Sequence, residues 1–155
     1  MSDPQCTETP RELIAAVEAR FGPLVIDLCA SRPNVCMNYI SPWDDSMRID
    51  WVDAYASAIS AGRFAWCNPP FGNQPPFLAK LAERKIPALA IIPYDSGTKH
   101  WQKCVRGIAR VEVLTSRVQF VGHTSAFPKP IALLVYEPGV DGAEGGAWNW
   151  KGTKR

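Results

Sequence analysis

The chain has 155 residues, a hydrophobic fraction of 46% and six tryptophans, a composition typical of one folded domain and not of a disordered segment. Its 17 basic and 15 acidic residues leave a net charge of +2, which is too small to identify a nucleic-acid partner. The sequence contains no run of 18 apolar residues, and its N-terminus lacks the basic and apolar regions of a signal peptide, so we expect no membrane span and no export.

The cysteines and the distribution of charge add two expectations. The five cysteines are odd in number and form no Cys-x-x-Cys pair, which favours a reducing, cytoplasmic environment and argues against a disulfide framework or a bound metal. Residues 1–78 carry 5 basic and 9 acidic side chains, whereas residues 79–155 carry 12 and 6. A polyanion would therefore meet the second half of the chain, although an uneven solvated surface explains the same imbalance equally well.

Helical and extended patterns alternate through the first half of the chain. A helix is expected from Thr9, because threonine can cap the first turn and Pro10 is tolerated inside it. Short apolar runs bounded by turn residues predict buried strands. In chain order we expect a helix ending before Gly22, strands over 24–30 and 35–40, an acidic loop over 42–50, a helix with Trp51, Tyr55 and Ile59 on one face that ends at Gly62, and a strand over 63–67.

The second half continues this alternation with helices over 75–85 and 98–107 and strands over 88–93, 110–116 and 131–137. Strands that alternate with helices predict an α/β fold with a mostly parallel sheet. The last two strands have no helix between them, so we expect an antiparallel pair at one edge of the sheet. We expect one domain over residues 1–137 and a glycine-rich, mobile tail over 138–155, although Trp148 and Trp150 indicate that part of the tail docks.

The most informative motif is Asn68-Pro69-Pro70-Phe71, which follows the strand 63–67 directly. Ligands of open α/β sheets bind beyond the carboxyl ends of the strands, so this motif and Asp27, near the end of the first strand, should face one crevice. Each proline fixes its φ angle and lacks an N–H group. The segment is therefore stiff and rich in hydrogen-bond acceptors.

Such a loop suits a substrate that carries an amino group on a planar ring. The Asn68 oxygen and main-chain carbonyls can accept both hydrogens of the amine while the ring stacks on Phe71. Hydrogen bonds to both amine hydrogens favour a nitrogen whose lone pair is not delocalised into the ring. Positioning and electrostatics would then suffice for methyl transfer, without an acid–base residue. A rigid turn at a strand end, without a ligand, is the alternative interpretation of the same motif.

The order of the motifs resembles that of the bacteriophage and prophage DNA N-6-adenine methyltransferases, within the S-adenosylmethionine-dependent amino-methyltransferases. The resemblance covers roughly residues 9–137 and depends most on Asn-Pro-Pro-Phe. The other matching pieces are, in chain order, the Thr-Pro helix start, Asp-x-Cys-Ala at the first strand end, Asn34 and an aromatic-acidic loop, Trp51, the strand ending Ile-Ile-Pro, a helix containing tryptophan, and the segments Ser-Arg-Val-Gln-Phe and Pro-Lys-Pro.

This resemblance implies a Rossmann-like methyltransferase fold, S-adenosylmethionine as methyl donor and double-stranded DNA as partner. It implies that Asn68, Pro69, Pro70 and Phe71 hold a flipped adenine. The cofactor would be approached by a second group of residues, namely Thr9, Pro10, Asp27, Cys29, Ala30 and either Asp44 or Asp45. The target strand would meet Arg117, Phe120 and Lys129.

The sequence departs from many methyltransferases in one place, because the turn after the first strand reads Asp-Leu-Cys-Ala-Ser-Arg-Pro-Asn and has no glycine. Ala30 and Ser31 are small enough for a cofactor to approach the backbone. Methylation of cytosine N-4, of an RNA base or of a glutamine amide, and an inactive DNA-binding relative, stay open as alternative functions. Several of these residues also have a purely structural interpretation. Asp27 could cap a helix, Asp44 and Asp45 could be ordinary loop acids, and Arg117 and Lys129 could be surface cations.

Overall fold

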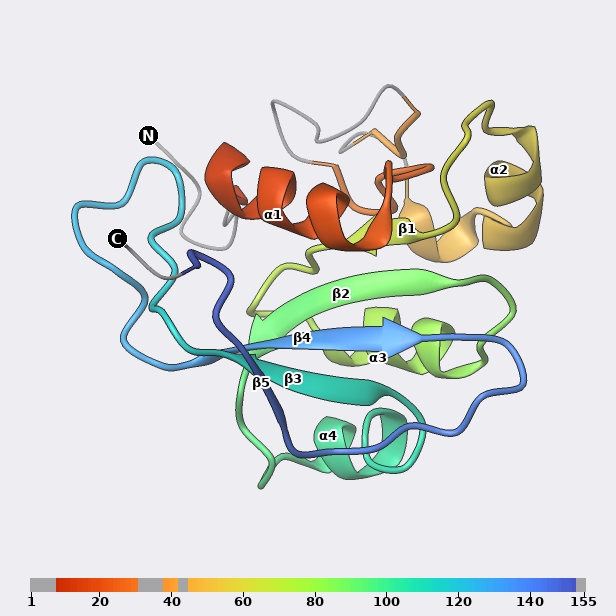
Figure 1. Ribbon diagram of the computed structural model, residues 1–155. Coiled ribbons are helices and arrows are strands. Elements are labelled where there is room, and N and C mark those ends of the chain that lie inside the picture. Colours follow the sequence, from red (N-terminus) through yellow and green to blue (C-terminus); the bar gives the residue numbers. More distant parts are fainter. Residues whose placement is uncertain (1–7, 31–37, 42–44, 153–155) are drawn as a thin grey trace.

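A computed structural model describes residues 8–30, 38–41 and 45–152 of the chain. Its centre is a five-stranded sheet in the order β1-β2-β4-β3-β5 (Figure 1). The strands are β1 (Ala65–Cys67), β2 (Ala88–Pro93), β3 (Arg110–Leu114), β4 (Ile131–Tyr136) and β5 (Gly146–Trp148). The helices are α1 (Arg11–Phe21), α2 (Trp51–Ser57), α3 (Pro75–Ala82) and α4 (Lys99–Cys104), with a short 3₁₀ helix η1 (Ser46–Arg48) before α2.

The sheet is mixed and not mostly parallel, which corrects the expectation from sequence. β1 pairs with β2 and β3 pairs with β5 in parallel, whereas β4 is antiparallel to both β2 and β3. The expected antiparallel pair of β3 and β4 forms, but it lies inside the sheet because β5 covers the free side of β3. The cause is the connection from β3 to β4, which has no helical crossover and so returns the chain antiparallel, between β2 and β3.

The two apolar runs expected as the first strands continue the sheet beyond β1 as single bridges. Asp27 bridges Trp66 on one side and Tyr39 on the other, both in parallel. The Trp66 amide donates to the Ile26 carbonyl at 2.8 Å, and the Leu28 amide donates back to the Trp66 carbonyl at 2.8 Å. A turn at 28–29 follows the bridge, and after it the Ala30 amide donates to the Ile40 carbonyl at 3.2 Å. Residues 35–37 of the second expected strand lie outside the described part of the chain.

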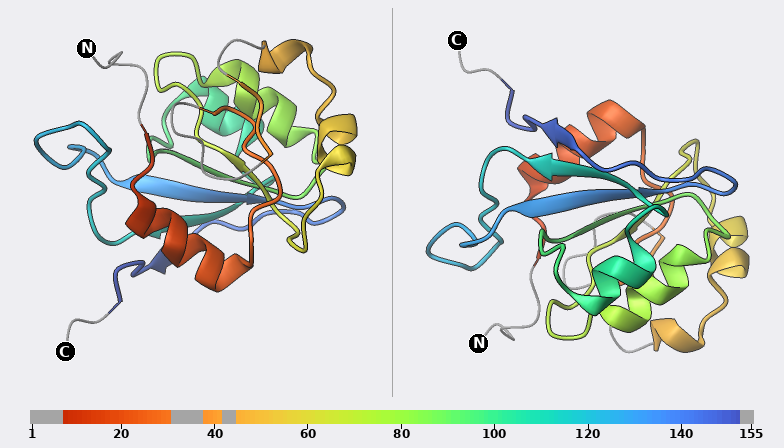
Figure 2. Two further views of the ribbon diagram at one scale, coloured as in Figure 1. Left: turned by 90° about the horizontal axis from the view of Figure 1, so that it is seen from above. Right: turned by 90° about the horizontal axis from the view of Figure 1, so that it is seen from below.

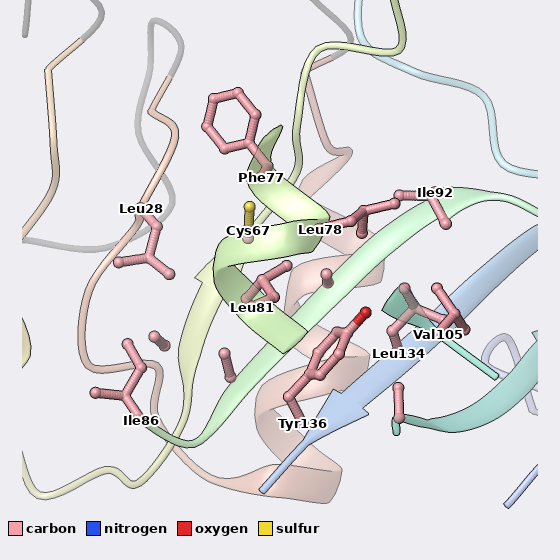
Figure 3. Packing of buried hydrophobic residues seen from close by; sticks show 14 of the residues in the cluster. Leu28, Cys67, Phe77, Leu78, Leu81, Ile86, Ile92, Val105, Leu134 and Tyr136 are labelled. Atoms are coloured by element: carbon pink, nitrogen blue, oxygen red, sulfur yellow. The ribbon is translucent and has the colours of Figure 1, made fainter. Parts of the chain in front are cut away.

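Helices cover both faces of the sheet. α1 lies on one face, and α3 and α4 lie on the other (Figure 2). Successive side chains of a strand point to opposite faces of the sheet, so a strand can pack against the helices on both faces. In β2, Leu89 and Ile91 pack toward α1, whereas Ala88, Ala90 and Ile92 pack toward α3 and α4. Figure 3 shows Cys67 of β1 and Tyr136 of β4 among the buried side chains that pack with Leu78 and Leu81 of α3.

Two helix boundaries differ from the expectation. Pro10, with φ −64° and ψ 142°, is the residue that precedes α1, and no side chain caps this helix, so Thr9 is not its N-cap. The helix expected to run to Gly62 ends at Ser57, and Ile59 is 95% exposed instead of lying on an apolar face. Asp50 caps the start of α2 by accepting hydrogen bonds from the amides of Val52 and Asp53.

The segment after Pro138 has a defined place in the described structure. Gly146–Trp148 forms β5, and the Trp150 side chain is 6% exposed and donates its indole N–H to the Ser116 carbonyl at 3.1 Å. The Arg20 guanidinium lies over the Trp148 ring and pairs with Glu112 at 2.8 Å. The domain boundary at residue 137 stays a prediction, but the chain that follows it adds a strand to the sheet.

Among the residues that the structure describes, no helix is long and apolar enough to cross a membrane. Over the same residues, no group of three or more His, Cys, Asp or Glu side chains is arranged to hold a metal ion.

Candidate active site

Asn68 lies directly after β1, at the carboxyl end of the strand, as expected from sequence. Its side-chain amide donates a hydrogen bond from Nδ2 to Oγ1 of Thr9 at 2.9 Å. Thr9 is 5% exposed, so this contact is shielded from water. The structure therefore joins two residues that the sequence analysis placed in the substrate group and in the cofactor group.

The two prolines lead the chain from Asn68 into a closed turn. Pro69 is buried, and the Pro70 carbonyl accepts a hydrogen bond from the Asn73 amide at 2.9 Å. The Gln74 side chain donates to the Phe71 carbonyl at 3.2 Å. Because Pro69 and Pro70 lack N–H groups, the segment between Asn68 and Phe71 presents carbonyl oxygens without competing main-chain donors.

Phe71 belongs to an aromatic cluster with Phe120 and Phe127. Its ring centroid lies 5.4 Å from that of Phe120 and 5.3 Å from that of Phe127, in edge-to-face arrangements. Phe71 is half-buried, whereas Phe120 is only 2% exposed. The expected contact of Phe120 with DNA stays a prediction; in this structure its buried ring packs against Phe71. Phe127 was missed, because an aromatic residue in a loop gives no local signal of what it packs against.

A groove of about 310 Å³ opens beside this aromatic cluster, at the carboxyl end of β2. It is lined by Phe71 and Gln74 of the proline loop, by Pro93 at the end of β2 and Asp95 after it, by Thr98 and His100 at α4, and by Phe127 and Lys129. The Lys129 ammonium lies 3.7 Å from the Asp95 carboxylate at the groove. The exposed Arg117 donates to the Pro128 carbonyl at 2.6 Å and so ties the two ends of the 117–129 loop together.

The expected cofactor residues Asp27, Cys29 and Ala30 lie in the turn beside β1. Asp27 is 3% exposed, and its carboxylate accepts a hydrogen bond from the Cys29 amide at 3.1 Å. This bond closes the turn that lacks a glycine. Burial raises the pKa of the Cys67 thiol well above its usual value, and Cys29 and Asp27 raise it further. Cys29 and Asp27 therefore lie near Cys67, which directly precedes Asn68. Asp27, Cys29 and Asn68 therefore share one end of the sheet.

Of the two later acidic candidates, Asp45 is exposed and Asp44 lies outside the described residues. The Asp45 carboxylate accepts from the Met47 amide at 3.0 Å and lies 3.5 Å from the Arg48 guanidinium, so it caps η1. The next residue, Ser46, donates its hydroxyl to the Leu28 carbonyl at 2.8 Å. η1 is thus anchored to the turn that carries Cys29 and Ala30, which brings Asp45 to the same region of the chain.

Comparison with known proteins agrees with this geometry. The family model of the DNA N-6-adenine-methyltransferase (Dam) matches residues 3–130. A DNA N-6-adenine-methyltransferase of Haemophilus phage HP1 (strain HP1c1) is 27% identical over 124 residues. Those residues cover 73% of this chain and 66% of the phage protein, slightly less than two thirds of its length. Because the family model spans most of the sequence and includes the proline loop, the chain belongs to the DNA N-6-adenine-methyltransferase (Dam) family.

Proposed function

We propose that this protein transfers a methyl group from S-adenosylmethionine to the exocyclic N-6 amine of adenine in DNA. The observation that carries the proposal is the position of the Asn68–Phe71 loop. It follows β1, the strand that the buried Asp27 bridges at Trp66, and its Phe71 lines a groove of about 310 Å³. That volume is at the small end of the range of roughly 300–1,000 Å³ for ligand pockets, which suits one base.

The loop supplies the chemistry that an aromatic amine needs. Asn68 Oδ1 and the Pro69 carbonyl would accept the two amine hydrogens and hold the nitrogen at a fixed place. Hydrogen bonds to both hydrogens reduce delocalisation of the nitrogen lone pair into the ring. The lone pair can then point toward the methyl group. Preorganised acceptors of this kind act through positioning and electrostatics, so no general base is required.

The turn beside β1 fits the cofactor. The fold that the family implies is Rossmann-like, and its ligands bind beyond the carboxyl ends of parallel strands. Asp27 is 3% exposed and accepts a hydrogen bond from the Cys29 amide, and a carboxylate has lone pairs enough to accept further bonds from an ammonium group or a ribose hydroxyl. Thr9, Pro10, Ala30 and one of Asp44 and Asp45 would complete the site. S-adenosylmethionine would supply an electrophilic methyl group there.

The base must leave the DNA duplex to reach the loop, at a cost of a few kcal/mol. Stacking on the Phe71 ring offsets part of this, because base–aromatic stacking is worth about 1–3 kcal/mol. Arg117 and Lys129 lie on the loop that borders the groove and would contact DNA phosphates. Both already hold partners within the protein, so their reach to DNA is part of the proposal.

The test is to incubate the purified protein with S-adenosylmethionine and unmethylated DNA and to analyse the nucleosides by mass spectrometry. We expect N-6-methyladenine in the DNA. N-4-methylcytosine would contradict the choice of base, and methyl transfer to RNA or protein alone would contradict the choice of DNA. DNA binding without cofactor binding and without any transfer would identify the protein as an inactive DNA-binding relative.

A further inference from the structure

We infer that Thr9 is a positioning residue that orients Asn68 for methyl transfer, an inference that rests on the proposed function. Its basis is the hydrogen bond from Asn68 Nδ2 to Thr9 Oγ1 at 2.9 Å. The two residues are 59 positions apart in the sequence, so the contact is made by the fold and not by a local turn.

The contact matters because the two ends of an amide differ. Nδ2 is a donor and Oδ1 is an acceptor. A target amine offers hydrogens, so it must meet Oδ1, and an amide turned by 180° would set two donors against each other. A hydroxyl can donate as well as accept, but in this structure Thr9 accepts from Nδ2, and that contact holds the amide in the orientation that keeps Oδ1 for the target amine. Because Thr9 is 5% exposed, water has little room to replace its hydroxyl as acceptor.

The backbone on both sides of Thr9 is fixed, which makes its hydroxyl a rigid reference point. The Glu8 carbonyl accepts from the Val121 amide at 3.0 Å, and the Pro10 carbonyl accepts from the Leu13 amide at 3.1 Å. Because Pro10 takes the position before α1 and no side chain caps this helix, the Thr9 hydroxyl is not used there. The same threonine that sequence reasoning assigned to a helix cap thus serves the catalytic loop.

The experiment compares single-turnover methylation by wild type, Thr9→Val, Thr9→Ala and Thr9→Ser at saturating DNA and cofactor. Thr9→Val keeps the shape but removes the acceptor, and Thr9→Ala guards against a folding defect caused by the added methyl group. Both should lower the rate by about 10- to 100-fold, since misplacement of a catalytic group by about 1 Å costs up to 10²-fold. Thr9→Ser should retain most of the rate.

A double-mutant cycle with Asn68→Ala separates positioning from cofactor binding. If Thr9 acts through Asn68, then Thr9→Val should cause no further loss once Asn68 is alanine. A full additional loss in the double mutant, or a loss in Thr9→Val that is matched by weaker cofactor binding, would overturn the inference. Thr115→Val is the matched control: it removes a hydroxyl that donates to the Trp148 carbonyl just after β3, which two strands separate from β1, and it should leave the rate unchanged.

A readout without catalysis distinguishes this inference from the proposed function. The Asn68 side-chain amide signal in a ¹⁵N–¹H NMR spectrum is assigned by its absence in Asn68→Ala. It should shift in Thr9→Val and remain near its wild-type position in Thr9→Ser. An unshifted signal in Thr9→Val would overturn the contact itself, whereas a wild-type protein that transfers no methyl group to DNA would overturn only the proposed function.

Discussion

Trp150→Ala should destabilise the protein strongly, although composition places residue 150 in a glycine-rich tail. The side chain is 6% exposed, and it packs in the layer on the α1 side of the sheet. A tryptophan buries about 150–250 Å², and about 25 cal/mol per Å² gives roughly 4–6 kcal/mol as an upper limit. Measured truncations of buried tryptophan cost about 3–5 kcal/mol, so we expect about 3 kcal/mol here.

The assay is urea unfolding followed by circular dichroism, together with thermal melts. For a chain of this length each kcal/mol moves the melting temperature by about 2–4 °C, so the drop should be roughly 6–12 °C. Trp150→Phe keeps a ring but removes the N–H bond to the Ser116 carbonyl, and it should lose less than Trp150→Ala. Ile59→Ala, at a position 95% exposed, is the control and should change stability by less than about 0.5 kcal/mol.

A loss below about 0.5 kcal/mol in Trp150→Ala, equal to that of an exposed control, would refute this reasoning. It would mean that residues 138–152 behave as the mobile tail that their composition indicates. A large loss would place these residues in the folded unit and move the domain boundary beyond residue 137.

Three further outcomes concern the site. Asn68→Ala should lower the single-turnover rate by about 10²–10³-fold with an unchanged melting temperature, while Phe71→Ala should also weaken DNA capture; a wild-type rate in Asn68→Ala would reduce the loop to a rigid turn. Arg117→Glu with Lys129→Glu should weaken DNA binding and flatten its salt dependence in filter-binding or fluorescence titrations, and an unchanged salt slope would remove both from the interface. Because burial raises the pKa of Cys67, its thiol should resist iodoacetamide at about pH 8 in the native protein and react on denaturation; equal labelling by mass spectrometry in both states would contradict this.

The elements that sequence predicted well are those with strong local signals. β2 was expected over 88–93 and forms there, because a short apolar run between turn residues fits a strand that is buried on both faces. The helix expected from Pro75 begins there, since proline is tolerated in a first turn. The Asn68 loop was expected at a strand end because it directly follows a short apolar run.

What sequence reasoning missed depends on partners far along the chain. β5 is three residues long and reads Gly-Ala-Trp, so it has no strand pattern of its own and exists through pairing with β3. The contact between the Phe120 and Phe71 rings has no local sequence signal, because the two residues are far apart in the chain. The Thr9 hydroxyl could be assigned to a cap or to a cofactor from local spacing, but its bond to Asn68 becomes visible only when the fold brings α1 and β1 together.

The same long-range contacts join the two functional parts of the site. The 117–129 loop, proposed to meet DNA, is attached at Val121 to the Glu8 carbonyl and at Phe120 to the Phe71 ring. Glu8 precedes the threonine that holds the Asn68 amide. A shift of this loop when DNA binds would therefore act on both the stacking ring and the acceptor. Under the proposed function, capture of the base and orientation of Asn68 would therefore depend on one packed unit, which would couple DNA contact to the chemical step.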